Sequence, residues 1–163
     1  QGNAQVLGAL LGRGDPELAG EVDTPVKPSR VMYAGLDAWT PVEGEVIEGL
    51  GLRRAGADAL AGTSSPVLDW IADEGIAHLA IHFDVDVLDP RRFAPVLFND
   101  PNASADFLAG VPRGRMAPDR GVRLLHDVAA ACDVVGLAIA EYTPWEAITT
   151  RAMLRKLPLL AGG

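Results

Sequence analysis

Residues 81–90 of the chain read IHFDVDVLDP, a short apolar run followed by three aspartates. The apolar start is typical of a buried strand, and Asp84 and Asp86 come where that strand should end. If the backbone stays extended, side chains two residues apart face the same way, so we expect both carboxylates to lie together. Two carboxylates side by side away from water repel each other, and a divalent cation would compensate them.

The type of ligand narrows the choice of cation. Carboxylate oxygens suit Mn²⁺, Mg²⁺ or Ca²⁺, whereas oxygen mixed with imidazole suits Mn²⁺ or Zn²⁺. The alternative reading is an acidic surface turn, which the apolar strand before it disfavours. Asp89 and Pro90 are expected to close the turn, with Asp89 accepting hydrogen bonds from nearby backbone amides.

The wider pattern predicts an α/β fold. Short apolar segments without polar alternation predict three buried parallel strands, at residues 30–36, 78–85 and 133–140. Amphipathic segments with capping residues predict helices at residues 43–52, 66–74, 119–131 and 149–157. This alternation predicts a three-layer α/β/α sandwich with a mostly parallel sheet and helices on both faces, in which ligands bind at the carboxyl edge of the strands.

Glu141 follows the third predicted strand, so its carboxylate could lie in the same cleft. A carboxylate there could hold a cationic substrate, because it pairs with a guanidinium group through two parallel hydrogen bonds. The alternative is an acidic residue that interacts with the start of the last helix. The residues alone leave both readings open.

Residues 91–117 form an insert that is too long for an ordinary connection and is rich in turn-forming residues. Its apolar residues predict that it folds against the body of the protein; they are Phe93, Val96, Leu97, Phe98, Phe107 and Leu108.

The composition excludes some classes of partner and does not identify a function. The 163 residues are 48% hydrophobic and carry a formal charge of −8, which disfavours nucleic acid and anionic membranes as partners. Cys132 is the single cysteine and is expected to pack in the interior. A single cysteine and the lack of a visible secretory signal predict a cytoplasmic protein. An unrelated α/β hydrolase lacks support, since no Gly-X-Ser-X-Gly turn is present.

Three blocks of the sequence resemble the arginase, agmatinase and formiminoglutamase (ureohydrolase) family. Residues 83–90 resemble its Ser-Phe-Asp-X-Asp-X-X-Asp-Pro signature, with His82 in place of the serine. Residues 140–144 resemble its Glu-Val-Asn-Pro segment, and residues 33–43 resemble, more weakly, its Ile-Gly-Leu-Arg-Asp-X-Asp-Pro-Gly-Glu segment. The blocks occur in the family's order, so the resemblance covers nearly the whole chain.

The resemblance implies that residues 1–163 are the C-terminal portion of a single arginase-like domain that is incomplete at its N-terminus. It implies a binuclear Mn²⁺ centre with Asp84 and Asp86 as ligands and Glu141 as the residue that binds the guanidinium or amidine group. The implied reaction is metal-assisted hydrolysis of a linear C–N bond in a small guanidino or amidino substrate. The implied parent protein is a homo-oligomer, a trimer or hexamer.

The metal ligands that the family takes from its Gly-Gly-Asp-His and Asp-Ala-His-X-Asp segments have no counterpart here. The three histidines are in other settings: His78 and His82 share a strand face, and His126 is on a predicted helix, partly exposed. His82 is expected either to be packed or to contact the metal ligands without binding the metal itself. Asp89 is expected to contact the metal ligands in the same way. Metal binding is therefore expected to be incomplete in this chain, which alone should be inactive.

The substrate segments also depart from the family pattern. Thr40 stands where the family has an aspartate that recognises the substrate's amino end. The opening stretch resembles the family's Gly-Asn-X-His-Gly segment, but either Asn3 or Gln5 falls at the histidine. A substrate other than arginine is therefore predicted. The alternative function is a non-catalytic arginase-fold fragment or assembly module.

Overall fold

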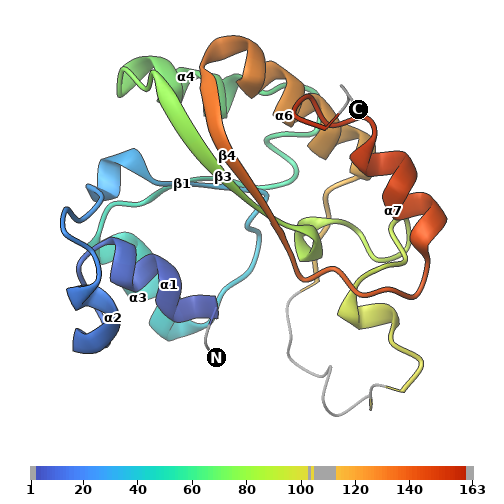
Figure 1. Ribbon diagram of the computed structural model, residues 1–163, viewed down its shortest axis with the longest axis horizontal. Helices are drawn as coiled ribbons and strands as arrows, with labels where there is room; N and C mark the ends of the chain where they lie inside the picture. The colour runs from blue at the N-terminus through green and yellow to red at the C-terminus, as the bar shows by residue number, and fades with distance from the viewer. Residues whose placement is uncertain (1–2, 103, 105–112, 161–163) are drawn as a thin grey trace.

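The computed structural model describes residues 3–102, 104 and 113–160 (Figure 1). Helices and short strands alternate along these residues. The helices are α1 (Asn3–Leu10), α2 (Pro16–Gly20), α3 (Pro41–Gly49), α4 (Ser65–Asp73), α6 (Pro118–Ala131) and α7 (Ala147–Leu154). The strands are β1 (Met32–Ala34), β2 (Arg53–Ala55), β3 (His78–Asp84) and β4 (Asp133–Ala140), with 3-10 turns η1 (Pro28–Arg30), η2 (Val85–Val87) and η3 (Leu97–Asn99). The three predicted strands and four predicted helices are present; β4 has the predicted ends, and the ends of the others are shifted.

The described strands form two parallel pairs, β1–β2 and β3–β4, where the sequence predicted one sheet. In the second pair Ile81 lies opposite Leu137 and Asp84 lies opposite Ala140. Strand β2 was not predicted, because three residues, two of them arginines, are too few and too polar to read as a buried strand. Helices α1 and α2 were also not predicted, since both are short.

Local sequence signals explain where several helices begin. Helix α3 starts at Pro41 behind Thr40, whose hydroxyl accepts a hydrogen bond from the Glu43 backbone at 3.3 Å. The Glu43 carboxylate accepts in return from the Thr40 backbone at 2.7 Å, which completes a capping box. Proline also stands within the first two positions of α4 and α6, where its missing N–H costs no helical hydrogen bond.

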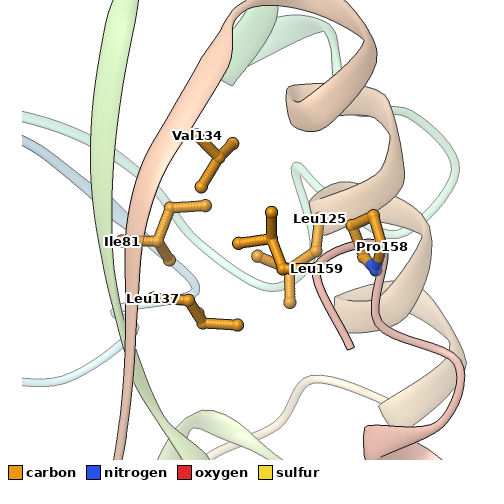
Figure 2. A pocket seen from close by; sticks show the side chains of 6 residues that line it. All are labelled: Ile81, Leu125, Val134, Leu137, Pro158 and Leu159. Carbon is orange, nitrogen blue, oxygen red and sulfur yellow. The ribbon is translucent and has the colours of Figure 1, made fainter. Parts of the chain in front are cut away.

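One hydrophobic core joins residues from both strand pairs and from α4, α6 and α7. On one face of the β3–β4 pair, Ile81 and Leu137 pack towards Leu125 of α6 and the segment Pro158–Leu159 (Figure 2). The void left there is about 10 Å³, room for one water molecule at most. This face is therefore filled.

The opposite face of the β3–β4 pair carries small side chains and His82. Ala80, His82 and Ala138 are exposed, and a Cβ added at Gly136 would meet no atom within 4 Å. Within the described residues, this face of the pair is therefore open.

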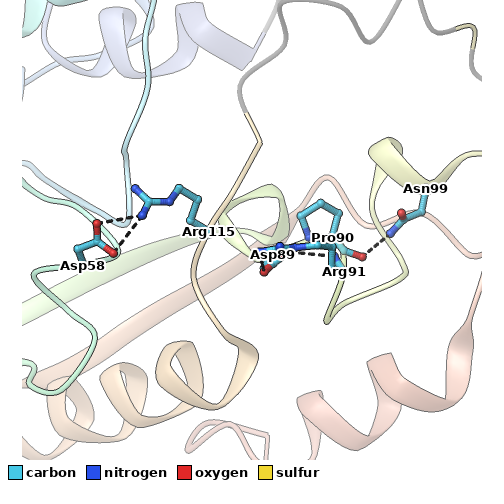
Figure 3. Close-up of polar contacts among 6 residues, drawn as sticks. All are labelled: Asp58, Asp89, Pro90, Arg91, Asn99 and Arg115. Atoms are coloured by element: carbon cyan, nitrogen blue, oxygen red, sulfur yellow. Dashed lines mark hydrogen bonds and ion pairs between the residues drawn. The ribbon is translucent and has the colours of Figure 1, made fainter.

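The predicted anchoring of the insert is confirmed where it can be followed. Phe93 and Val96 are fully buried and Phe98 is buried as well. Asn99 donates a hydrogen bond from its side-chain amide to the carbonyl of Pro90 at 2.8 Å (Figure 3). The same amide donates to the carbonyl of Ala94 at 3.1 Å. The predicted anchors Phe107 and Leu108 lie outside the described residues.

Cys132 is half-buried, and burial and the neighbouring Asp133 raise the pKa of its thiol, which suits a packing residue. None of the helices in the described part of the chain is long and apolar enough to cross a membrane.

Candidate carboxylate site at the strand ends

Asp84 and Asp86 lie together at the carboxyl end of β3, but not for the reason that the sequence suggested. The strand ends at Asp84 and the chain turns at once into η2, so the segment between them is not extended. The Asp84 carboxylate accepts a hydrogen bond from the Asp86 backbone N–H at 3.0 Å. This cap on the turn, and not strand alternation, brings the two carboxylates together.

Asp86 is the most strongly perturbed group of this edge. Burial, followed by the negative charges of Asp84 and Glu141, raises the pKa of Asp86 to about 7. Its Oδ1 atom is buried and has no hydrogen-bond partner in the described structure. A carboxylate in this position is uncompensated by the protein near neutral pH, which is the situation that a bound cation relieves.

Glu141 joins this cluster from β4. Because β3 and β4 run parallel and Asp84 pairs with Ala140, the residue after β4 lies beside the turn after β3. Glu141 has a φ of 59°, the one positive φ at a non-glycine residue in the described ranges. Such a backbone costs roughly 1–2 kcal/mol for a residue with a Cβ. Strain of this kind is concentrated at functional sites, so it supports the interpretation of Glu141 as a site residue and not a helix-start acid.

Asp89 supports the turn, and its carboxylate is bound by Arg91. Its Oδ1 accepts from the Arg91 backbone at 2.9 Å, which confirms the predicted turn closure. The Arg91 guanidinium binds both carboxylate oxygens, at 3.0 and 2.8 Å (Figure 3). These hydrogen bonds lower the pKa of Asp89 to about 2.

Residues at the end of the insert contact the turn that follows β3. Met116 donates its N–H to the Val87 carbonyl at 3.1 Å, and its own carbonyl accepts from the Asp89 N–H at 2.9 Å. A Cβ at Gly114 would overlap the Asp86 carbonyl oxygen, so glycine is needed for this close approach. The end of the insert therefore packs directly against residues 86–89, the turn that follows β3.

The end of β1 lies at the same edge. Gly35 has a φ of +90°, and a Cβ there would overlap the side chain of Val87 in η2. Asp37 follows, accepting from the Ala57 N–H at 3.0 Å through Oδ1. Its Oδ2 atom is buried without a hydrogen-bond partner, and the nearest cation is Arg115, 3.9 Å away. Arg115 also pairs with Asp58 at 3.0 Å (Figure 3).

Asp37 and Arg115 were not among the site residues predicted from the sequence. The position of Asp37 just after a predicted strand was the available signal. No sequence signal places Arg115 there, because it comes from the end of the insert.

The remaining predicted site residues lie apart from this cluster or serve other roles. His82 is exposed, so its predicted packing is wrong, and any role behind the metal ligands stays a prediction. His78 pairs with Asp133 at 3.2 Å at the opposite end of the strands. The Thr40 hydroxyl caps α3, and Asn3 opens α1 with a side chain outside the described structure. Substrate contacts of Thr40 and Asn3 stay predictions.

The predicted Mn²⁺ centre fits these residues only in part. The carboxylates of Asp84 and Asp86 and the orphaned Oδ1 of Asp86 suit a hard divalent cation. The described residues contain no group of three or more histidine, cysteine, aspartate or glutamate side chains that could hold a metal ion. His126 is exposed on α6, as predicted, and bonds to the Lys156 carbonyl at 2.6 Å. The described chain thus offers carboxylates but no imidazole partners.

Comparison with solved structures identifies the fold. An arginase of Entamoeba histolytica in complex with L-ornithine matches 96% of this chain and 51% of its own, with a TM-score of 0.74 and 19% identity. The arginase of Bacillus cereus matches 91% of this chain and 51% of its own, with a TM-score of 0.71 and 21% identity. The proclavaminate amidino hydrolase of Streptomyces clavuligerus matches 79% of this chain and 38% of its own, with a TM-score of 0.54 and 18% identity.

No protein-family model and no curated protein sequence matches the chain. The chain spans about half the length of the arginases it matches in structure. The three-layer α/β/α architecture predicted from the sequence is confirmed by these matches. The chain therefore has the arginase fold, and the ureohydrolase resemblance read from its sequence is confirmed at the level of the fold.

Proposed function

We propose that this chain is the C-terminal portion of a metal-dependent hydrolase of the ureohydrolase type. The observation that carries the proposal is the cluster of Asp84, Asp86 and Glu141 at the carboxyl edge of a parallel strand pair. Burial and the two neighbouring carboxylates raise the pKa of Asp86 to about 7, and its Oδ1 atom has no partner in the described structure. The match in fold to the Entamoeba histolytica arginase supports the proposal.

In this proposal Asp84 and Asp86 are ligands of a binuclear Mn²⁺ centre. Metal ions at such a site supply an attacking water of lowered pKa. The hydrogen bond from the Asp86 N–H fixes the Asp84 carboxylate, leaving its second oxygen for a metal. Further ligands must come from residues outside the described part of the chain, since the described residues provide no group of three.

Glu141 is proposed to bind the substrate. A carboxylate close to the metal ligands can hold a guanidinium or amidine group by two parallel hydrogen bonds. The departures at Thr40 and Asn3 favour a guanidino or amidino substrate other than arginine. We propose cleavage of a linear C–N bond in that substrate by the parent protein, with the 163-residue chain inactive by itself.

Calorimetric titration with Mn²⁺ tests the metal proposal. The chain alone should bind Mn²⁺ weakly or not at all, whereas a longer form of the protein that adds the missing ligands should bind two ions tightly. Tight binding of two ions by this chain alone would refute the account of missing ligands.

Substitution tests the residues. Asp86→Ala in the longer form should abolish hydrolysis and Mn²⁺ binding, and Glu141→Gln should abolish hydrolysis while metal binding persists. Asp23→Asn, at an exposed carboxylate away from the site, is the matched control and should change neither. Unchanged turnover in Asp86→Ala would rule out its role as a ligand.

A second candidate is a non-catalytic arginase-fold fragment or assembly module. The incomplete set of ligands in the described residues favours it, as do the exposed apolar side chains of Val135, Ile139 and Tyr142. Light scattering after gel filtration tests this function: the module predicts stable assembly without Mn²⁺ and no hydrolysis in any longer form. The proposed trimer or hexamer and the cytoplasmic location rest on the resemblance and on composition.

A further inference from the structure

A second, larger cavity lies beside the carboxylate cluster and is not used by the proposed reaction. It has a volume of about 510 Å³ and lies between the end of β4, helix α7 and Leu160. This is within the range of about 300–1,000 Å³ that is typical of small-molecule sites. The filled face shown in Figure 2, with its void of about 10 Å³, offers no comparable space.

The interior of this cavity is apolar. Val85 and Met153 are buried at its base. Ile139, Tyr142 and Leu160 line it as well and remain 36%, 40% and 46% exposed, so apolar surface around the cavity is uncovered in this chain. An apolar ligand body would remove that surface from water, which favours binding.

Two arginines give the cavity a positive rim. Arg151 and Arg155 both line it, and they stand four residues apart at the end of α7, where side chains face the same way. Both are exposed, and neither forms an ion pair among the described residues. Glu146, at the other end of α7, is engaged by the Thr149 N–H at 2.9 Å. Two like charges on adjacent turns repel each other, and an anion between them would relieve the repulsion.

We propose that this cavity binds an amphipathic carboxylate, a small acid with an apolar body. The carboxylate head lies between Arg151 and Arg155, and the body lies over Ile139 and Tyr142. Charge complementarity selects the anion, because the chain as a whole carries a formal charge of −8 and repels anions elsewhere. The site is distinct from the proposed metal site, although Val85 lies between Asp84 and Asp86 and Tyr142 follows Glu141.

Calorimetry with octanoate and 1-octanol separates the two parts of this site. Octanoate should bind the 163-residue chain more tightly than 1-octanol, which has a body of the same length without the charge. The variant R151Q/R155Q should bind octanoate at least about tenfold more weakly and 1-octanol within about twofold of the unchanged chain. Lys156→Gln, a matched loss of charge at a neighbour that does not line the cavity, should leave both affinities unchanged.

A second variant tests the apolar part. Ala147→Trp places a large ring in the cavity from its exposed position on α7 and should abolish binding of both probes. Circular dichroism checks that each variant is folded. Failure of octanoate to bind, or equal binding by the unchanged chain and R151Q/R155Q, would overturn the proposal. In that case the arginines act only on the helix dipole, and R151Q/R155Q would lower the thermal stability alone.

Discussion

The substitution Asp86→Asn should make the stability of this protein less sensitive to pH between pH 5 and pH 8. In the folded chain, burial and the charges of Asp84 and Glu141 raise the pKa of Asp86 from 3.8 to about 7. The folded state therefore keeps a proton on Asp86 over a pH range in which the unfolded state has lost it. Because the folded state binds more protons there, the free energy of unfolding falls as the pH rises towards 7.

The size of this effect follows from the two pKa values. A rise from 3.8 to about 7 corresponds to about 4 kcal/mol between the protonation states. Asp86 is only half-buried, so screening by solvent reduces its contribution to the free energy of unfolding to about 2 kcal/mol. Between pH 5 and pH 8 the unchanged chain should lose roughly 1–2 kcal/mol of stability through Asp86. Asparagine has a similar shape and does not titrate, so the variant should not show this loss.

Urea unfolding at pH 5 and pH 8, with a chelator present to remove metal, measures the difference. Asp23→Asn is the control, because it removes an exposed carboxylate outside the cluster and should keep the pH dependence of the unchanged chain. If Asp86→Asn and the unchanged chain have the same pH dependence within about 0.3 kcal/mol, Asp86 is not a buried, repelled carboxylate and the reasoning is wrong.

Three further predictions concern the same region. Glu141→Gly should be more stable in thermal unfolding than Glu141→Ala, by roughly 1 kcal/mol, because glycine adopts the observed φ of 59° without strain; equal stability would contradict a strained backbone. Arg91 lowers the pKa of Asp89 from 3.8 to about 2. The stabilisation from the ionised Asp89–Arg91 pair is therefore fully present above pH 3.8 and is lost as the pH falls through about 2. Asp89→Asn should therefore lose less stability than the unchanged chain between pH 4.5 and pH 2 in acid titration, and an equal loss would count against the pair. Phe93→Ala should cost about 3–5 kcal/mol in urea unfolding, because Phe93 is fully buried, and a cost below about 1 kcal/mol would refute anchoring of the insert.

The sequence by itself predicted strands β1, β3 and β4, helices α3, α4, α6 and α7, and the order of the chemistry along the chain. The apolar runs predicted β3 and β4, and Thr40 with Pro41 predicted the start of α3, because strand burial and helix capping depend on residues close in sequence. The same local patterns placed Asp84, Asp86 and Glu141 at strand ends, and the turn chemistry of Asp89 was correctly predicted.

Only the tertiary structure decided how these parts meet. The turn η2, the parallel register of β3 with β4 and the return of Gly114 and Met116 onto that turn join segments far apart in sequence. The pKa of Asp86 and the exposure of His82 follow from those contacts, since both depend on which atoms exclude water and which charges lie nearby. The arginase fold was readable from motif order, but the strain at Glu141 and the cavity beside α7 are properties of packing, which no local pattern encodes.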